Sequence, residues 1–396
     1  MSVPDWPRLR IGEVVDFFDS RRIPLSKMER QLRQGRFPYY GASGVIDYLD
    51  DYLFDGRYLL VAEDGENLNS RKLPVAFFAT GQFWVNNHAH VLRGKSGLID
   101  DVYLQAWFAN TNLSPFITGA AQPKLSQANL KRITLPVPPL MVQRQMAAVL
   151  SAYDELIENN TRRIQILEEM ARTIYREWFV EFRYPGHGNV PSIESDRGLI
   201  PEGWSVKPLA DVATIVMGQS PSSEFYNVQG DGLPFHQGVT NFGRHFPSNR
   251  TFTTVGDRLA EAGDVLFSVR APVGRINVAT CDLVLGRGLC AIRGTSDVWA
   301  LLLSALLDQF QELDTMGSGA IFNSVKKSDM QGIRLVWPSD DLVSQFNAIT
   351  EPMFALLRTL TTQAEHLRQA RDLLLPRLIS GELDVSELDI EGVPAA

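Results

Sequence analysis

Apolar residues recur at alternating steps of three and four along two long stretches of the chain. After Pro139 the spaced apolar positions are Met146, Val149, Tyr153, Ile157, Ile164, Leu167, Ala171, Ile174 and Trp178. After Pro338 they are Phe346, Ile349, Met353, Leu356, Leu360, Ala364, Leu367, Leu374 and Leu378. An average step of 3.5 residues over several heptads is typical of a coiled-coil seam. We therefore predict two helices of about 40 residues, each roughly 60 Å long at about 1.5 Å per residue.

One polar residue, Asn160, falls at an inward position of the first predicted seam. A polar residue at such a position can fix the register of a coiled coil at some cost in stability. An exposed asparagine at a frayed site would account for the pattern equally well, so both interpretations stay open.

The stretches between the helices differ in kind, because they hold short runs rich in β-branched and aromatic residues. Examples are residues 58–62, 75–79, 264–268 and 289–292, and Gly, Asn and Asp turns separate them. These runs predict compact mixed domains built on twisted sheets with long loops. Residues 184–203 are rich in Gly, Pro and Ser, which is typical of a linker.

An internal repeat with a period near 200 residues organises the whole chain. Residues 133–138 (ITLPVP) match residues 333–338 (IRLVWP), and each match precedes one of the predicted long helices. Further pairs at the same offset include Gln145 with Gln345 and Leu167 with Leu367. A repeat of this length predicts two copies of one unit, a mixed domain followed by a helix.

Composition limits the class of protein. The chain has 396 residues, 44% of them hydrophobic, which is enough for two or three domains with ordinary cores. The longest apolar stretch, residues 298–307, is half the length of a membrane span, and the first ten residues do not resemble a leader. Only two cysteines are present, Cys281 and Cys290, too few for a disulfide framework. We therefore expect a cytoplasmic protein with no membrane contact.

The charge pattern bears on nucleic-acid binding. A formal net charge of -8 argues against it, but residues 336–396 alone carry 4 basic and 10 acidic groups. The segment from Arg21 to Arg36 holds six basic residues against one acid, Glu29. Such a run fits either a solvated helix face or a phosphate-binding patch.

We find no constellation typical of an enzyme. Residues 94–96 (GKS) resemble the end of a phosphate-binding loop, but Ala89 stands where that loop needs its first glycine. The tetrapeptide with which adenine methyltransferases hold a flipped base is absent from the sequence. His88 and His90 share one face of a predicted strand, yet no nearby carboxylate or cysteine completes a metal set. We therefore expect no catalytic residues and no metal site.

Four sequence elements together resemble the specificity subunit of type I restriction-modification systems. Residues 12–15 (GEVV), 37–48 (FPYYGASGVIDY), 60–67 (LVAEDGEN) and 86–90 (NNHAH) resemble one form of its target-recognition domain. Residues 218–222 (GQSPS) and 263–270 (GDVLFSVR) resemble another form. Residues 135–143 (LPVPPLMVQ) and 375–383 (LPRLISGEL) resemble the entry to the central helix and the ending of the family.

This resemblance implies an α+β protein in which two tandem mixed α/β target-recognition domains are joined by two long antiparallel coiled-coil helices as a pseudo-twofold repeat. We expect recognition domains at 1–138 and 204–338, spacer helices at 139–183 and 339–383, a linker at 184–203 and a tail at 384–396. The function implied is sequence-specific binding of double-stranded DNA at a bipartite target. Modification (methyltransferase) subunits, two of them, and restriction (endonuclease) subunits would be the partners. S-adenosylmethionine, ATP and Mg²⁺ would bind those partners and not this chain.

Arg and Lys read guanine, Asn and Gln read adenine, and hydroxyls contact phosphates, so polar loop residues are the candidates for DNA contact. In the first domain they are Arg21, Arg22, Tyr39, Tyr40, Ser43, Asn67, Asn69, Arg71, Asn86 and Asn87. In the second domain they are Gln219, Ser220, Ser222, His236, Gln237, Asn241, Arg244, Arg270 and Arg287.

Two rival functions follow from the same sequence. The first is a non-catalytic assembly scaffold with degenerate recognition domains, which the acidic net charge favours and the loop motifs in both halves disfavour. The second is an enzyme whose site is too dispersed to recognise from sequence.

Overall fold

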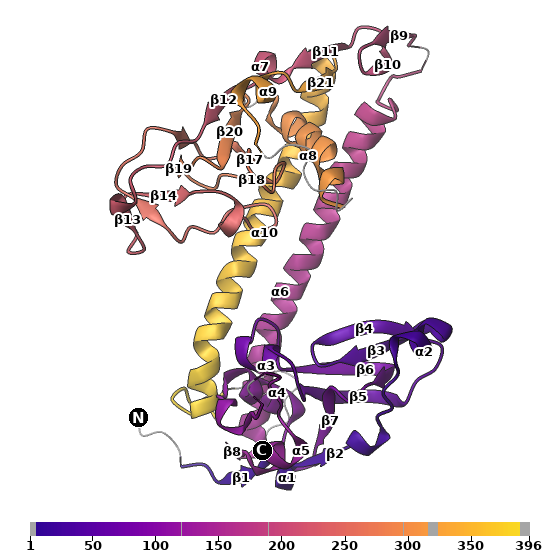
Figure 1. The fold of residues 1–396 in the computed structure, drawn as a ribbon, viewed down its shortest axis with the longest axis vertical. Coiled ribbons are helices and arrows are strands. Elements are labelled where there is room, and N and C mark those ends of the chain that lie inside the picture. Colours follow the sequence, from indigo (N-terminus) through magenta and orange to yellow (C-terminus); the bar gives the residue numbers. More distant parts are fainter. Residues whose placement is uncertain (1–4, 120, 189, 296, 316–323, 389–396) are drawn as a thin grey trace. The chain divides into compact units, whose positions relative to one another are not determined.

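The computed structural model describes residues 5–388, apart from 120, 189, 296 and 316–323. The chain divides into two compact units, residues 1–160 with 363–396 and residues 161–362. Each unit therefore takes part of both long helices. Of the tail expected at 384–396, residues 389–396 lie outside the described part of the chain. The predicted α+β class is confirmed (Figure 1).

The first unit is built on a six-stranded sheet with strand order β2-β7-β5-β6-β3-β4. Its strands are β2 (Val15–Phe17), β3 (Gln34–Gly41), β4 (Gly44–Leu49), β5 (Phe54–Ala62), β6 (Ala76–Val85) and β7 (Ala89–Gly94). Every pairing is antiparallel except that of β3 with β6. The unit also contains β1 (Arg8–Arg10), α1 (Ile11–Val14), α2 (Lys27–Leu32), α3 (Asn67–Ser70), α4 (Asp101–Asn110), α5 (Gln127–Arg132) and β8 (Thr134–Pro136).

Both faces of this sheet are buried, because alternate residues of β5 enter different cores. Leu59 and Val61 pack in the core that contains Trp107 of α4 and residues from both long helices. Tyr58 and Leu60 face the other way, into a smaller aromatic core. The period of two along a strand explains this division.

Among its described residues, the second unit contains two larger sheets besides two sheets of two strands. One has the order β12-β20-β17-β18 and the other β13-β15-β14-β19-β16. The strands of the first are β12 (Thr214–Met217), β17 (Val265–Ser268), β18 (Ile276–Val278) and β20 (Leu289–Arg293). Those of the second are β13 (Tyr226–Asn227), β14 (Leu233–His236), β15 (Phe252–Thr253), β16 (Leu259–Ala260) and β19 (Leu283–Leu285). The unit also holds β9 (Ser192–Ser195), β10 (Gly198–Pro201), β11 (Ser205–Pro208), α7 (Leu209–Val212), α8 (Trp299–Thr315), α9 (Lys327–Gln331) and β21 (Arg334–Trp337).

The predicted repeat is confirmed at the level of single hydrogen bonds. In the first unit β1 pairs antiparallel with β8, and in the second β11 pairs antiparallel with β21. The amide of Ile11 donates to the carbonyl of Ile133, and the amide of Leu209 donates to that of Ile333, both at 2.8 Å. The two halves therefore share a backbone scaffold even where their side chains differ.

The two predicted long helices are present as α6 (Leu140–Tyr175) and α10 (Asp340–Ser380), drawn in magenta and yellow in Figure 1. A π-helical turn, Arg176–Val180, extends α6. Within the first unit the start of α6 lies beside the end of α10, where Arg371 pairs with Asp154 at 2.6 Å. Within the second unit the end of α6 lies beside the start of α10, where the rings of Tyr175 and Phe346 are 6.3 Å apart. Both pairings are antiparallel, as the resemblance implied.

The predicted seam is correct in α6 but partly wrong in α10. Ile349 and Leu356, which we expected to face inward, are 41% and 39% exposed. The inward positions are Thr350 and Leu357, one residue further along. Thr350 can lie inside the seam because its hydroxyl donates to the carbonyl of Phe346 at 2.9 Å. Asn160 of α6 is buried, at the inward position of the seam.

The segment expected as a linker, residues 184–203, contains the β9–β10 hairpin. Tyr184 and Ile200 from this segment are buried in the core of the second unit, where the Tyr184 ring lies 5.2 Å from that of Trp204. The segment is thus anchored near its two ends, and most of its described residues are exposed. None of the helices in the described part of the chain is long and apolar enough to cross a membrane.

Candidate nucleic-acid interface

In the part of each unit that the structure describes there is one parallel strand pair, and polar loops leave the carboxyl ends of both pairs. In the first unit β3 and β6 align Tyr40 with Val85, and the amide of Asn86 donates to the Tyr40 carbonyl at 3.1 Å. In the second unit β14 and β19 align His236 with Leu285, and the amide of Gly286 donates to the His236 carbonyl at 2.8 Å. The carboxyl ends of parallel strands are common places for binding sites. We call these places the first edge (residues 40–44 and 86–88) and the second edge (residues 218–220, 236–238 and 286–288).

Five of the predicted DNA-contact residues lie at the second edge: His236, whose side chain is buried, and Gln219, Ser220, Gln237 and Arg287. The Ser220 hydroxyl donates to Gln237 Oε1 at 2.7 Å and accepts the backbone N–H of Arg287 at 3.1 Å. The backbone N–H of Gln219 donates to the carbonyl of Leu285 at 2.9 Å. The side chains of Gln219, Gln237 and Arg287 are exposed.

Glycines hold the second edge together by direct backbone contact. A Cβ on Gly218 would lie 2.1 Å from the carbonyl oxygen of Gly286. A Cβ on Gly286 would lie 2.5 Å from the Cα of Gln237, and one on Gly288 would lie 2.5 Å from the Gln237 carbonyl oxygen. These distances exclude any side chain without a backbone shift. The exposed polar side chains therefore project from closely packed backbone.

The first edge brings together Tyr40, Ser43, Asn86 and Asn87. Asn86 is only 4% exposed, and its Oδ1 accepts the backbone N–H of His88 at 2.8 Å. Burial, with a smaller contribution from Tyr48, raises the pKa of Tyr40, so its phenol remains a hydrogen-bond donor at neutral pH. Ser43 and Asn87 are exposed. This edge thus offers fewer free polar groups than the second.

Several predicted DNA-contact residues instead hold the fold in this structure. Tyr39 is buried, and its hydroxyl accepts the Leu25 amide at 3.0 Å. Burial lowers the pKa of His236, whose ring lies 3.0 Å from Asn249 Oδ1. Arg71 caps the end of α4 by donating to the carbonyl of Ala109 at 3.1 Å.

The remaining candidates are spread over other surfaces of their units. Asn67 closes its own loop by bonding to both the amide and the carbonyl of Leu73. Arg21 donates to the Leu53 carbonyl at 2.5 Å, and Arg244 pairs with Glu168 of α6. Exposed side chains away from the two edges are those of Asn69, Ser222 and Arg270, and Asn241 is half-buried.

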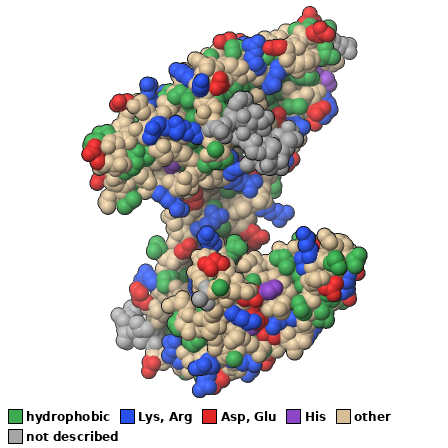
Figure 2. Space-filling view, viewed as in Figure 1, with side chains coloured by type: hydrophobic (Ala, Val, Ile, Leu, Met, Phe, Trp, Pro, Cys, Tyr) green, Lys and Arg blue, Asp and Glu red, His purple; other side chains and the backbone are tan. Residues whose placement is uncertain are grey.

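Half of the basic residues in the run from Arg21 to Arg36 are paired with acids within the first unit. Arg30 pairs with Asp47 at 2.9 Å, and Arg33 pairs with Asp50 at 3.0 Å. Asp47 lies on β4 and Asp50 directly after it, and the pairing of β4 with β3 brings both within reach of these arginines. The sequence pattern did not predict this pairing. On the face drawn in Figure 2, described basic and acidic side chains are interspersed over both units.

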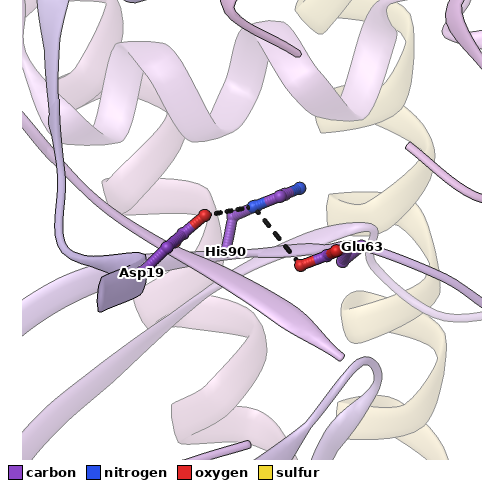
Figure 3. A group of neighbouring side chains, drawn as sticks. All are labelled: Asp19, Glu63 and His90. Atoms are coloured by element: carbon purple, nitrogen blue, oxygen red, sulfur yellow. Dashed lines mark hydrogen bonds and ion pairs between the residues drawn. The ribbon is translucent and has the colours of Figure 1, made fainter. Parts of the chain in front are cut away.

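A buried charged cluster that the sequence did not reveal lies behind the first edge. The Asp19 and Glu63 side chains point at the ring of His90, whose Nδ1 is 2.6 Å from Asp19 Oδ2 (Figure 3). Arg22, another predicted DNA-contact residue, joins the cluster by pairing with Glu63 at 2.8 Å. Asp19 lies 71 residues before His90, so no local motif connects them.

Among the described residues Asp19, Glu63 and His90 are the one group whose ligand atoms are close enough to hold a metal ion. The hydrogen bonding favours an ion-pair network instead. His90 Nε2 faces the carbonyl oxygen of Leu125 at 2.8 Å, so each ring nitrogen has an oxygen of this chain as its hydrogen-bond partner. Both ring nitrogens are thus engaged within the chain, and the Arg22 guanidinium beside Asp19 and Glu63 would repel a cation.

Acid is expected to weaken the first unit through Asp19. Burial alone would raise the pKa of Asp19, but hydrogen bonds from His90 and Val91 and the charge of Arg22 lower it below its ordinary value. A carboxylate with a lowered pKa stabilises the fold above its unfolded pKa, about 3.9, and loses that contribution as the pH falls through its folded value. Hydrogen exchange of β7 during urea unfolding should show Asp19→Asn less stable than wild type at pH 7.

The difference between wild type and Asp19→Asn should shrink as the pH falls below about 3.9, where the Asp19 carboxylate of the unfolded chain becomes protonated. Asp16→Asn, an exposed change on β2, is the matched control and should follow wild type at both pH values. A gap that stays constant from pH 7 to pH 3 would show that the Asp19 charge does not stabilise the unit.

Comparison with known proteins then identifies the family. The profile of the type I restriction modification DNA specificity domain matches residues 4–169. The MjaX specificity subunit of a type I restriction enzyme from Methanocaldococcus jannaschii is 30% identical over 293 residues, which cover 72% of this chain and 68% of that protein. This chain belongs to the family of type I restriction enzyme specificity subunits. The S.HindORF215P specificity subunit of Haemophilus influenzae is also 30% identical, over 69% of this chain and 67% of its own length.

A solved structure shows the same fold. The S subunit of a type I restriction-modification system from M. genitalium aligns over 96% of this chain and 98% of its own, with a TM-score of 0.70 at 14% identity. The function of the chain is therefore that of a specificity subunit, the component of a type I restriction-modification enzyme that recognises the DNA target. Target recognition is supported over the scaffold alternative.

Proposed function

We propose that this specificity subunit reads a bipartite target in double-stranded DNA through its two edges, one half-site for each unit. The observation that carries the proposal is the equivalence of the edges in the repeat. Asn86 and Asn87 stand 200 residues before Gly286 and Arg287, at the end of the same kind of parallel strand pair. Different side chains on one backbone scaffold are what two different half-sites require.

The interspersed surface charges are consistent with a recognition subunit whose partner subunits make many of the contacts with DNA phosphates. The formal net charge of -8 gives this chain no overall excess of cations, and half of the basic run is paired with acids inside the first unit. Phosphate contacts supply affinity but no sequence information, and they can come from any subunit of a complex. Base contacts must come from the recognition subunit itself.

Two modification subunits would dock on the long helices. Leu156 of α6 and Leu356 of α10 are separated by the 200-residue repeat, and they are 53% and 39% exposed. Ile166 and Met170 add to the outward apolar surface of α6. Large exposed apolar side chains that recur at one position of a repeat favour the same kind of partner bound twice.

The chemistry would belong to those partners. Modification subunits would bind S-adenosylmethionine and methylate adenine, and restriction subunits would use ATP and Mg²⁺. This chain would contribute no catalytic residue and would act in the cytoplasm, where the cellular DNA is.

Methylation sequencing tests the proposal directly. In cells that express this chain with its cognate modification subunit, we expect adenine methylation at one split motif. Neither protein alone should produce it. An assembled complex that methylates no defined motif would favour the scaffold function, and methylation by this chain alone would refute a purely recognising role.

A further inference from the structure

In the second edge, the Gln237 amide is hydrogen-bonded to Ser220 through its oxygen. The backbone N–H of Arg287 can only donate, so Ser220 Oγ accepts it, at 3.1 Å. The Ser220 hydroxyl also donates its own hydrogen to Gln237 Oε1, 2.7 Å away. The amide oxygen is thereby turned towards Ser220, and the NH₂ group is left as the outward end of an exposed side chain.

Arg287 places a second donor beside this amide. Its side chain is exposed, and it has no ion pair or side-chain hydrogen bond with any described residue. A guanidinium carries five N–H donors and no acceptor. Gly286 and Gly288 flank Arg287 and pack against the backbone of Gln237, so the two side chains leave from fixed neighbouring positions. The second edge therefore presents donors from two adjacent loops.

Donors of this kind match one base better than the other three. In the major groove guanine presents two acceptors, N7 and O6. Adenine pairs one acceptor with one donor, cytosine presents a donor, and thymine presents one acceptor beside a methyl group. We propose that Gln237 and Arg287 read a guanine in the half-site of the second unit, with Ser220 as the positioning residue that holds the Gln237 amide. This inference rests on the proposed function.

The first edge lacks this arrangement, which makes the guanine requirement specific to one half of the target. The counterpart of Gly286 is Asn86, whose Oδ1 is occupied by the His88 amide. The counterpart of Arg287 is Asn87, which carries both a donor and an acceptor. The two half-sites are therefore read by different hydrogen-bonding groups, and the target is asymmetric.

The test uses the purified complex of this chain with its modification subunits and duplexes that carry the motif found by methylation sequencing. Each guanine is replaced in turn by 7-deazaguanine, which lacks the N7 acceptor. At one guanine this change should weaken wild-type binding about 10-fold. Gln237→Glu, which replaces the donor NH₂ with an acceptor, should weaken binding of the unmodified duplex about 10- to 100-fold and abolish the effect of 7-deazaguanine there.

Ser220 has a separate test that a merely structural role would not satisfy. Ser220→Ala frees the Gln237 amide to present both its oxygen and its NH₂, the pair that recognises adenine. The preference for guanine over adenine at that position should therefore fall at least about fivefold. Ser220→Thr keeps the hydroxyl and should restore the preference.

The matched control is Gln331→Glu, which makes the same change on an exposed glutamine of α9. It should leave binding and base preference unchanged, and size-exclusion chromatography should show that every variant assembles. A Gln237→Glu complex that keeps wild-type sensitivity to 7-deazaguanine at every guanine would overturn this inference while leaving the proposed function intact. A wild-type complex with no defined motif would instead overturn the proposed function, and this inference with it.

Discussion

Phe346→Ala is expected to destabilise the second unit by about 3–5 kcal/mol, the usual range for removing a buried aromatic ring. Phe346 is completely buried, and its ring lies 6.3, 5.9 and 5.0 Å from the rings of Tyr175, Trp178 and Phe179. These contacts join the start of α10 to the end of α6 within the second unit. Alanine would leave a cavity among large rings that cannot collapse to fill it.

The repeat supplies the control for this prediction. Met146 stands 200 residues before Phe346, is equally buried, and belongs to the core of the first unit. Met146→Ala should cost about 2–5 kcal/mol in that unit. Hydrogen exchange of the full chain in urea measures the stability of each unit separately. Loss of protection in β17 and β20 reports unfolding of the second unit, and loss of protection in β5 and β7 reports unfolding of the first. Equal loss in both units from Phe346→Ala would mean that they unfold as one.

The repeat and the helices could be predicted because their signals are periodic. Residues 133–138 and 333–338 match although some of their side chains differ. The two segments form equivalent backbone hydrogen bonds, β8 with β1 and β21 with β11. Both matched segments contain the strand that closes a domain just before its long helix. Choosing the seam positions of α10 by hydrophobicity alone failed at Thr350. The sequence does not show that the buried Thr350 hydroxyl donates to a carbonyl of the preceding helical turn.

The candidate site could be predicted only in part. Ser220, Gln237 and Arg287 are polar loop residues in the sequence, and the structure brings them together through the β14–β19 pairing. Glycines on both sides of Arg287 were a local signal for close backbone packing that the sequence interpretation did not use. The roles of Asp19 and Arg22 had no local signal, because His90 follows Asp19 by 71 residues and Glu63 follows Arg22 by 41 residues.

Removing one heptad from both long helices is expected to shorten the preferred spacer between the half-sites. Deleting residues 157–163 and 360–366 joins Leu156 to Ile164 and Thr359 to Leu367, so an apolar residue still fills each seam position. The deletion removes about 10 Å from each helix at about 1.5 Å per residue. That length corresponds to about three base pairs, at about 3.4 Å for each base pair. Half-site separation is a geometric property of a two-part reader, so the spacer should shorten by up to about three base pairs.

Methylation sequencing of cells that express the shortened chain with its modification subunit measures the spacer directly, because both half-sites appear in the methylated motif. The half-site sequences should not change, since neither edge lies in the deleted segments. A chain of normal length with Glu158, Asn159 and Arg162 changed to alanine is the control, and it should keep the original spacer because these side chains are exposed. An unchanged spacer in an assembled, active shortened complex would show that the helices do not set half-site separation, and altered half-sites would show that the deletion has disturbed the edges instead.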